Sequence, residues 1–490
     1  MRRYAIGLLA FLLCSCTVGP NYVRPCVQTP VKFKEVPKGW KVAEPKVVNC
    51  NNAEWWKIFN DPLLNSLEPQ VALYNQNIKS AAAVYEQAYY LVQEARAAYY
   101  PTLDFSGSLV RQKRVASSTV SSSTTSFSPT GGTILGTTTG GSSSSVTTSH
   151  TLLLDALWEP DIWGQVKRTV EAAQGGANAN GALFAATKLS MQATLAQSYF
   201  SLRALDTDQK LLDDTVRDYK AALKITKNQY TSGTAQRTDV LQAQSLLESA
   251  EALAINNGIS RGKFEHAIAV LIGKPPECFS LPRMPLTTKP PIIPLEMPST
   301  LLERRPDVAQ AEYLAIQANA QIGVAISAFY PTLSLSGTAS MAGANYAHWF
   351  SLPMLAWAVG PQLAQNLFDG GLRQATTDAA RANYQSTVAL YRQAVLAAFQ
   401  DVEDNLVSIR LLQAQVAALN KAAADAKRAE KLILNQYKAG TVAYSSVLTA
   451  QINAYTAQKT AADVVGLQMA SAVGLIKALG GGWDGVLRCS

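Results

Sequence analysis

One unit of sequence occurs twice in this chain, at two different offsets. The segment AYYPTLDFSGSL at 98–109 returns as AFYPTLSLSGTA at 328–339, so the two prolines are 331 − 101 = 230 residues apart. The segment QYTSGTAQRTDVLQAQ, which begins at Gln229, returns as QYKAGTVAYSSVLTAQ from Gln436, an offset of 436 − 229 = 207 residues. Repetition of this kind predicts one structural unit built twice. The first copy therefore holds 230 − 207 = 23 additional residues between its matched blocks.

The additional residues fall in an interval that contains a tract of serine, threonine and glycine, Ser117–Ser149. A tract with so few large apolar side chains cannot form a packed core, so we expect a solvated surface loop. An O-glycosylated or adhesive tract is the alternative interpretation.

Long helices are predicted by the distribution of proline. No proline occurs between Pro160 and Pro275 or after Pro361, and alanine-rich sequence without proline favours helix. If 371–437 is one helix, it is about 100 Å long at ~1.5 Å per residue. Within it, apolar residues recur at steps of three and four, the pattern of a coiled-coil seam: Val395, Phe399, Val402, Leu406, Ile409, Leu412, Val416, Leu419 and Ala423.

Each long helix is expected to end at a tight turn and to be followed by a second helix. The turns are Gly233–Thr234 in the first copy and Gly440–Thr441 in the second. Helix, short turn and helix form an αα-hairpin, so each copy folds back on itself at a tip. In the first copy, Gly175, Gly176 and Asn180 interrupt the helical pattern near its start and predict a kink there.

The two YPTL segments have the opposite period, which is that of a β-strand with one apolar and one polar face. The aromatic pairs before the prolines, at 99–100 and 329–330, fit an aromatic girdle at a membrane surface. Return strands are expected near 152–158 and 355–363. The apolar positions of the second copy are Leu333, Leu335, Gly337, Ala339 and Met341, and those of the first include Leu103, Phe105 and Leu109.

Four strands are too few to close a membrane barrel, because bacterial outer-membrane barrels begin at about eight. An open sheet edge facing lipid leaves backbone groups without hydrogen bonds, which is prohibitively unfavourable. If these strands lie in a membrane, several chains must close one barrel. A small strand pair in a soluble protein is the alternative for either block alone.

The N-terminus has the layout of a secretion signal with a lipid-attachment site. Arg2 and Arg3 precede an apolar run, Ala5–Leu13, that is too short to span a bilayer. The order Leu13-Cys14-Ser15-Cys16 then resembles a bacterial lipoprotein processing site, in which Cys16 receives a diacylglycerol and an N-acyl chain such as palmitate. Two such lipids suffice for stable anchoring. An ordinary signal peptide with incidental cysteines is the alternative.

Net charge and cysteine content bear on two further questions, nucleic-acid binding and disulfide bonds. The formal net charge is +8, but the basic residues are dispersed instead of forming the stripe typical of nucleic-acid binding, so no nucleic-acid partner is expected. In an oxidising compartment the remaining cysteines could form one or two disulfides of undetermined connectivity: Cys26, Cys50, Cys278 and Cys489.

Several motifs together resemble the TolC-like outer membrane factors, specifically the NodT-type lipoprotein branch of efflux channels. They are CTVGPNYVRP after Leu13-Cys14-Ser15, WWKIFNDPLLNSL at 55–67, the paired YPTL segments, LLERRPDVAQAE at 301–312, LFDGG at 367–371 and ALGGGWDG near the end. The resemblance implies a mixed α and β membrane protein. Three chains would form one barrel of about twelve strands in the outer membrane, continued by a long periplasmic α-helical barrel.

The resemblance also orders the chain into segments. These are a signal peptide at 1–15, a lipid-anchored extended arm at 16–61, a first repeat at 62–277 with its loop at 117–149, a proline-rich linker at 278–298, a second repeat at 299–482 and a tail at 483–490. It implies a passive exit duct that works with a periplasmic adaptor and an inner-membrane transporter. The adaptor is expected to contact Gly233, Thr234, Gly440 and Thr441.

In the family, residues just after the second turn close the periplasmic end and commonly include an acidic residue. Here Ser445, Ser446 and Thr449 occupy that stretch, so a neutral constriction with weak cation dependence is expected, since hydroxyl groups neither repel each other nor bind cations strongly. Asp239 is the acidic candidate in the first copy. Its alternative role is that of a partner for the N-terminal dipole of the following helix.

Catalysis has little support in the sequence. His150, His266 and His348 have no metal-ligand spacing, and the glycine-rich segment near the end lacks the strand-to-helix context of a phosphate loop. We therefore expect no enzyme activity, metal or cofactor besides the lipids on Cys16. The alternative function is that of a lipid-anchored surface coiled-coil adhesin or structural lipoprotein, but a coiled-coil stalk has no use for four amphipathic strands.

Overall fold

The computed structural model describes residues 17–30, 32–35, 52–114, 145–288, 290–293, 304–343, 355–481 and 483. The predicted signal peptide, Cys16, Cys50, Cys489 and most of the predicted loop at 117–149 lie outside these residues. The chain divides into two compact units. The first comprises Met1–Pro20, Gln93–Val170 and Gln321–Asp378, and the second comprises Asn21–Val92, Glu171–Ala320 and Ala379–Ser490.

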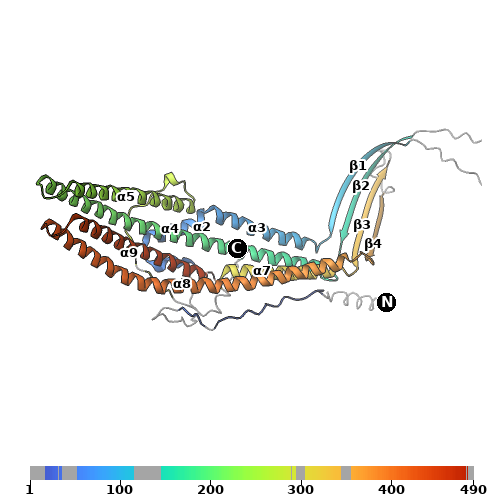
Figure 1. Ribbon diagram of the computed structural model, residues 1–490. Coiled ribbons are helices and arrows are strands. Elements are labelled where there is room, and N and C mark those ends of the chain that lie inside the picture. Colours follow the sequence, from blue (N-terminus) through green and yellow to red (C-terminus); the bar gives the residue numbers. More distant parts are fainter. Residues whose placement is uncertain are drawn as a thin grey trace, which may run out of the picture. The chain divides into compact units, whose positions relative to one another are not determined.

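The first unit contains one antiparallel sheet whose strands follow each other in the order β1-β2-β3-β4 (Figure 1). The strands are β1 (Thr102–Arg114), β2 (Ser145–Trp158), β3 (Thr332–Gly343) and β4 (Leu355–Ala364). Both YPTL segments and both predicted return strands are therefore confirmed as strands. Among the described residues, β1 and β4 each pair on one side only, so both lateral edges of the sheet are open.

The strand register sorts side chains onto an apolar and a polar face. Phe105, Leu154, Ala339 and Trp357 stand opposite one another across all four strands, and Phe105 and Trp357 expose 71% and 73% of their surface. In the next row Asp104 stands opposite Asp155, which is followed by Thr338 and Ala358. The sheet thus presents an unpartnered apolar face, and period-two alternation is its cause.

One predicted boundary in this region is wrong. The serine- and threonine-rich tract was expected to stay a loop up to Ser149, but residues 145–149 belong to β2 and pair with 110–114 of β1. The β-branched Val146, Thr147 and Thr148 favour strand, and pairing with β1 satisfies their backbone groups.

The first described residues of the N-terminal arm lie against the connection between β2 and the helix that follows. Val18 N donates to Trp163 O at 3.1 Å, and Arg168 donates from Nη2 to Gly19 O at 3.1 Å. A Cβ on Gly164 would meet Thr17 at 3.0 Å. Trp163 also stacks on Tyr330, with ring centroids 4.9 Å apart. Residues Thr17, Val18 and Gly19 are thus held beside Trp163 and Tyr330, the aromatic residues at the base of the strands.

Helices supply most of the second unit, and α3, α4, α7 and α8 contribute residues to both units. The bounds are η1 (Asn52–Phe59), α2 (Pro62–Tyr74), α3 (Gln76–Ala97), α4 (Gln165–Thr231), α5 (Arg237–Leu271), η2 (Pro276–Cys278), α7 (Pro306–Ser327), α8 (Leu372–Lys438) and α9 (Tyr444–Ala478).

Corresponding elements of the two sequence copies have equal lengths. Helices α3 and α7 each have 22 residues and start 306 − 76 = 230 positions apart. Helices α4 and α8 each have 67 residues, and α5 and α9 each have 35. Their starts differ by 372 − 165 = 207 and 444 − 237 = 207 positions. The elements therefore follow both offsets of the sequence.

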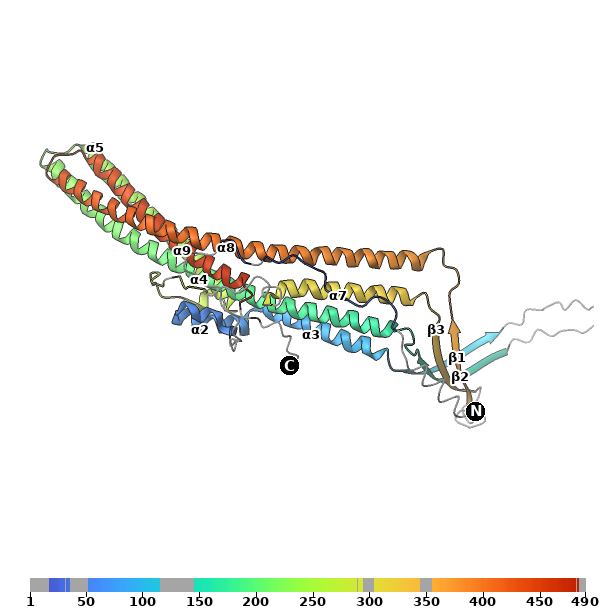
Figure 2. The ribbon, with the colours of Figure 1, turned by 90° about the horizontal axis from the view of Figure 1, so that it is seen from below.

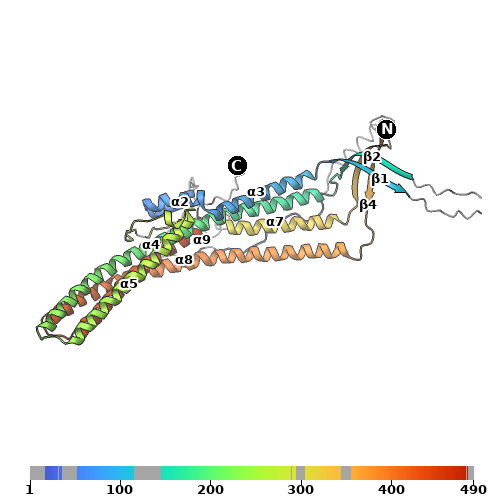
Figure 3. The same cartoon turned by 90° about the horizontal axis from the view of Figure 1, so that it is seen from above.

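Two helical hairpins, α4/α5 and α8/α9, form as predicted, and their turns lie side by side in each view (Figures 2 and 3). Near the turns a cluster of buried side chains joins the four helices: Tyr219, Leu223, Ala243, Leu247, Ala250, Tyr437, Tyr444 and Val447. A larger cluster joins η1 and α2 to the same helices and includes Trp56, Phe59, Leu64, Val71, Phe200, Ile268, Val402, Leu406 and Met469. Val395, Val402 and Leu406 of the predicted seam are completely buried.

Helix α4 continues through Gly175, Gly176 and Asn180, so these residues do not end the helix. The kink expected there stays a prediction. The glycines serve close packing. A Cβ on Gly175 would lie 3.0 Å from the backbone nitrogen of Gln317 on α7. Asn180 Nδ2 donates to Gly176 O at 2.9 Å within the helix. Close contact with α7 therefore explains why glycine occurs at these two positions.

Arg305, in the ERRPDV motif, binds three parts of the second unit. Its guanidinium donates to Ala398 O on α8 at 3.3 Å and to Ala478 O on α9 at 3.1 Å. It also pairs with Asp307 and Asp401 at 2.6 and 2.9 Å. Arg305 thereby fixes the start of α7 against the last turn of α9.

Cys26 and Cys278 are exposed free thiols, so they do not pair with each other.

Among the described residues, α9 is long and apolar enough to cross a bilayer, but 50% of its most apolar stretch is buried. A buried core helix has the same composition.

Candidate functional site

The two hairpin turns have the same geometry. Gly233 and Gly440 have positive φ angles of 77° and 75°, which an L side chain rarely adopts. Thr234 donates from both its backbone N and its Oγ1 to Gln229 O, at 2.9 and 3.0 Å. In the other turn, Thr441 donates from the same two atoms to Gln436 O, both at 3.0 Å. Glycine reverses the chain and threonine satisfies the last helical carbonyl, which explains the repeated Gly-Thr.

Asp239 and Ser446 are equivalent residues of the two copies, since 446 − 239 = 207, but their side chains have different roles. Asp239 Oδ2 accepts a hydrogen bond from the backbone N of Gln236 at 3.3 Å and so caps the start of α5. Its side chain is half-buried. The cap fits the helix-terminus role that was the alternative for Asp239. The first turn of α9 has no acidic residue.

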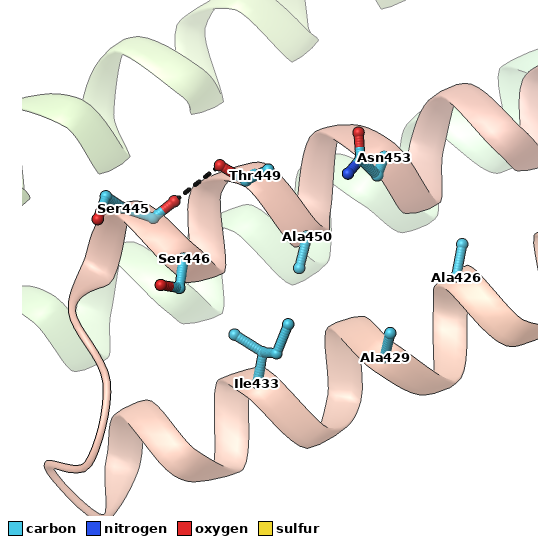
Figure 4. A pocket seen from close by; sticks show the side chains of 8 residues that line it. All are labelled: Ala426, Ala429, Ile433, Ser445, Ser446, Thr449, Ala450 and Asn453. Atoms are coloured by element: carbon cyan, nitrogen blue, oxygen red, sulfur yellow. Dashed lines mark hydrogen bonds between the residues drawn. The ribbon is translucent and has the colours of Figure 1, made fainter.

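The predicted hydroxyl residues of the second hairpin lie together beside a cavity between α8 and α9. Ser445, Ser446 and Thr449 are exposed, and Thr449 Oγ1 donates to Ser445 O at 3.0 Å (Figure 4). The cavity has a volume of about 530 Å³. Its other lining residues are Ala426, Ala429, Ile433, Ala450 and Asn453. The lining is neutral, so the site can exclude or admit a chain or solute by shape and hydrogen bonding, but not by charge. Asp239 does not line this cavity.

Two tyrosines that the motifs did not single out support the second turn. Tyr437 and Tyr444 stand on either side of it with ring centroids 5.3 Å apart and planes at 63°. Both are buried. Burial, with smaller contributions from Tyr437 and the charge of Asp239, raises the pKa of Tyr444 to about 12. The signal in the sequence is an aromatic residue seven positions after Tyr437, on each side of Gly440–Thr441.

Cys16 lies outside the described residues, but its neighbour Thr17 is placed. Lys167 Nζ donates to Thr17 Oγ1 at 3.0 Å. No group of three or more His, Cys, Asp or Glu side chains suited to a metal ion occurs in the described part of the chain.

Comparison with known proteins gives one consistent family. A family model described as outer membrane efflux protein matches residues 69–274 and 297–481. The chain is 28% identical over 483 residues to the probable efflux pump outer membrane protein TtgC of Pseudomonas putida, covering 98% of this chain and 95% of that protein. It is 26% identical to the cation efflux system protein CusC of Escherichia coli, covering 97% and 98%. The solved structure of the outer-membrane channel OprN superposes with a TM-score of 0.83 at 25% identity, covering 96% of this chain and all of that one.

Proposed function

Because this chain belongs to the outer membrane efflux protein family, we propose that it is the outer-membrane channel of a tripartite efflux system. It acts as a passive exit duct for small molecules, from the periplasm to the outside. It resides in the outer membrane and has no catalytic step of its own.

The observation that carries this proposal is the sheet of the first unit. Its apolar face exposes phenylalanine, leucine and tryptophan side chains in register, and both of its lateral edges are unpaired among the described strands. Unpaired backbone groups cost several kcal/mol each in hydrocarbon. Three copies would close 3 × 4 = 12 strands into one barrel, within the size range of about 8 to 26 seen in bacteria. The apolar face then meets lipid, and the face with Asp104 and Asp155 lines the lumen.

The homotrimer extends into the periplasm as a barrel of the paired helices, each chain supplying two repeats. The hairpin ends at Gly233–Thr234 and Gly440–Thr441 are the contacts for a periplasmic adaptor, which opens the duct together with an inner-membrane pump. The neutral cavity lining of Ser445, Ser446 and Thr449 supports a constriction in the second copy that does not depend on cations. Asp239 remains the acidic candidate of the first copy, although its cap hydrogen bond supports a structural role.

A diacylglycerol and an N-acyl chain on Cys16 anchor the arm. Support comes from Thr17, which is fixed beside Trp163 and Lys167 at the base of the strands. Replacing Cys16 with serine is expected to abolish palmitate incorporation and leave the channel folded. Labelled palmitate that is incorporated equally by both proteins would contradict the anchor.

The duct is tested by planar-bilayer conductance of the purified native protein, with native mass spectrometry of the same sample. A trimer with discrete conductance steps, even rare ones from a closed state, supports the proposal. A folded monomer that never conducts would instead favour the lipid-anchored coiled-coil alternative.

A further inference from the structure

We propose that the ends of the two hairpins form a cationic docking surface whose partner is an acidic, helical end of the adaptor. This inference rests on the proposed function, which makes these ends the adaptor contact. The tip surface is defined as residues 224–239, around the first turn, and 431–446, around the second. The two ranges are equivalent, since 431 − 224 = 207.

The tip surface concentrates positive charge. It contains five cations, Lys224, Lys227, Arg237, Lys431 and Lys438, and all five are exposed. Its one acidic residue gives a net charge of 5 − 1 = +4 on 32 residues, half of the formal +8 of the whole chain.

None of the five cations forms an ion pair with a described residue. Two lysines just beyond the tip surface are paired between helices. Lys220 pairs with Glu251 at 2.8 Å, and Lys427 pairs with Asp218 at 3.0 Å. The positive charge of the tip surface therefore has no ion-pair partner among the described residues.

The one acidic residue of the tip surface is already engaged. Asp239 Oδ2 accepts the Gln236 backbone hydrogen bond at 3.3 Å and is half-buried. The positive charge of this exposed end is therefore not balanced within the described chain, and an anionic partner would be attracted to it. Lys224 and Lys431 recur at the same place in both copies, so the surface attracts the same chemistry at each hairpin.

A helix is the form of partner that the adjoining cavity favours. Its lining carries three alanines, two serines and a threonine, and small side chains at a contact let helix axes approach closely. The cavity offers neither a charge nor an aromatic platform, which are the features that would hold a lipid headgroup or a nucleic-acid base.

The test uses the purified full-length lipoprotein and two synthetic 24-residue alanine-rich helical peptides, one with glutamate and one with lysine at every fourth position. Binding is followed by fluorescence anisotropy at low and high salt. The tip variant is Lys224→Glu/Lys431→Glu. The matched control is Lys210→Glu/Lys421→Glu, which changes the net charge equally at exposed lysines of the same helices, more than about one Debye length from the tip surface.

The glutamate peptide is expected to bind the native protein, and the tip variant to weaken that binding about tenfold at low salt. The control should change it less than about twofold. Filling the cavity with Ala429→Trp should also weaken binding. Equal affinity for both peptides, or equal losses in both charge variants, overturns the inference. Tip-dependent binding of phosphatidylglycerol vesicles without peptide binding would overturn it too, and would identify a lipid surface as the partner.

Conductance of the same preparation separates this inference from the proposed function. A conducting trimer that ignores the glutamate peptide refutes the docking surface alone. A non-conducting monomer that binds the peptide through Lys224 and Lys431 refutes the duct and leaves the cationic surface standing.

Discussion

Glu68 gives the sharpest prediction, because its carboxyl group is buried without any partner. The residue lies on α2, on the same helix face as Leu64 and Val71, and like them it is completely inaccessible to solvent. Neither carboxyl oxygen has a hydrogen-bond partner. Burial raises the pKa of Glu68 from 4.5 to about 9, so the folded protein holds the group in its neutral, protonated form at pH 7.

The sign of the pH dependence follows from linkage. Between pH 4.5 and about 9 the folded state binds a proton that the unfolded segment has released, so the stability of α2 falls as pH rises. The slope is about 1.4 kcal/mol per pH unit. The stability of α2 is greatest at pH values below the pKa of the unfolded state, 4.5. At pH 7 it is lower by about 3 kcal/mol.

The perturbation is Glu68→Leu, and the measurement is hydrogen exchange of the α2 amides, corrected for the intrinsic pH dependence of exchange. Native protection is expected to fall about tenfold per pH unit between pH 5.5 and 8.5, because local opening must ionise the carboxyl group. Glu68→Leu should abolish the slope and stabilise α2 by about 3 kcal/mol at pH 7.

Two controls isolate the charge. Glu68→Gln should also abolish the slope, but α2 should be less protected than with leucine because the buried amide stays unsatisfied, at about 1–3 kcal/mol. Glu86→Gln changes an exposed carboxylate on α3 and should leave the native slope intact. A slope that persists in Glu68→Leu, or is absent from the native protein, would refute the reasoning.

Three further predictions concern packing and conduction. Arg305→Ala removes hydrogen bonds to two buried carbonyls and should destabilise the second unit by about 3 kcal/mol in thermal unfolding. Arg305→Lys should recover part of this stability. An unchanged melting temperature in Arg305→Ala would show that Arg305 does not fix α7 against α9. Conductance of the reconstituted channel should persist in millimolar Mg²⁺, and Ser446→Asp should make the conductance sensitive to Mg²⁺. The neutral constriction would be contradicted if Mg²⁺ abolished the native conductance and a substitution of Ser446, but not one of Asp239, restored it. Asp104→Asn/Asp155→Asn should lower cation preference in reversal-potential measurements, because these opposed side chains lie on the polar face of the sheet; an unchanged preference would remove that face from the lumen.

Local patterns predicted the regular elements because each was governed by local physics. Alternation at 333–341 reports which side chains share a sheet face, and the Gly-Thr pairs report turns that need a positive φ. Because corresponding helices of the two copies start at constant offsets, the bounds of a helix in one copy predict those of its equivalent in the other. These features depend on neighbours within a few residues, so they can be read without tertiary contacts.

The features that were missed depend on residues distant in sequence. The Gly175–Gly176 pair lies against Gln317 of α7, a contact that the sequence does not reveal. Glu68 would be expected at a helix surface, but tertiary packing buries it completely. Arg305 lies in a recognisable motif, but its hydrogen bonds to Ala398 and Ala478 span 93 and 173 residues. The sequence allows two roles for Asp239, and the hydrogen bond that it accepts from the Gln236 backbone supports the structural one.

The double hydrogen bond of each tip threonine determines how these ends can move. Thr234 and Thr441 each hold one helical carbonyl with both a backbone and a side-chain donor, around a glycine whose φ no other residue adopts easily. Such a turn has little local freedom to unwind. If these ends close the proposed duct, we expect each hairpin to move as one unit when the duct opens, and the packing of Tyr437 against Tyr444 keeps the two helices of the second hairpin together.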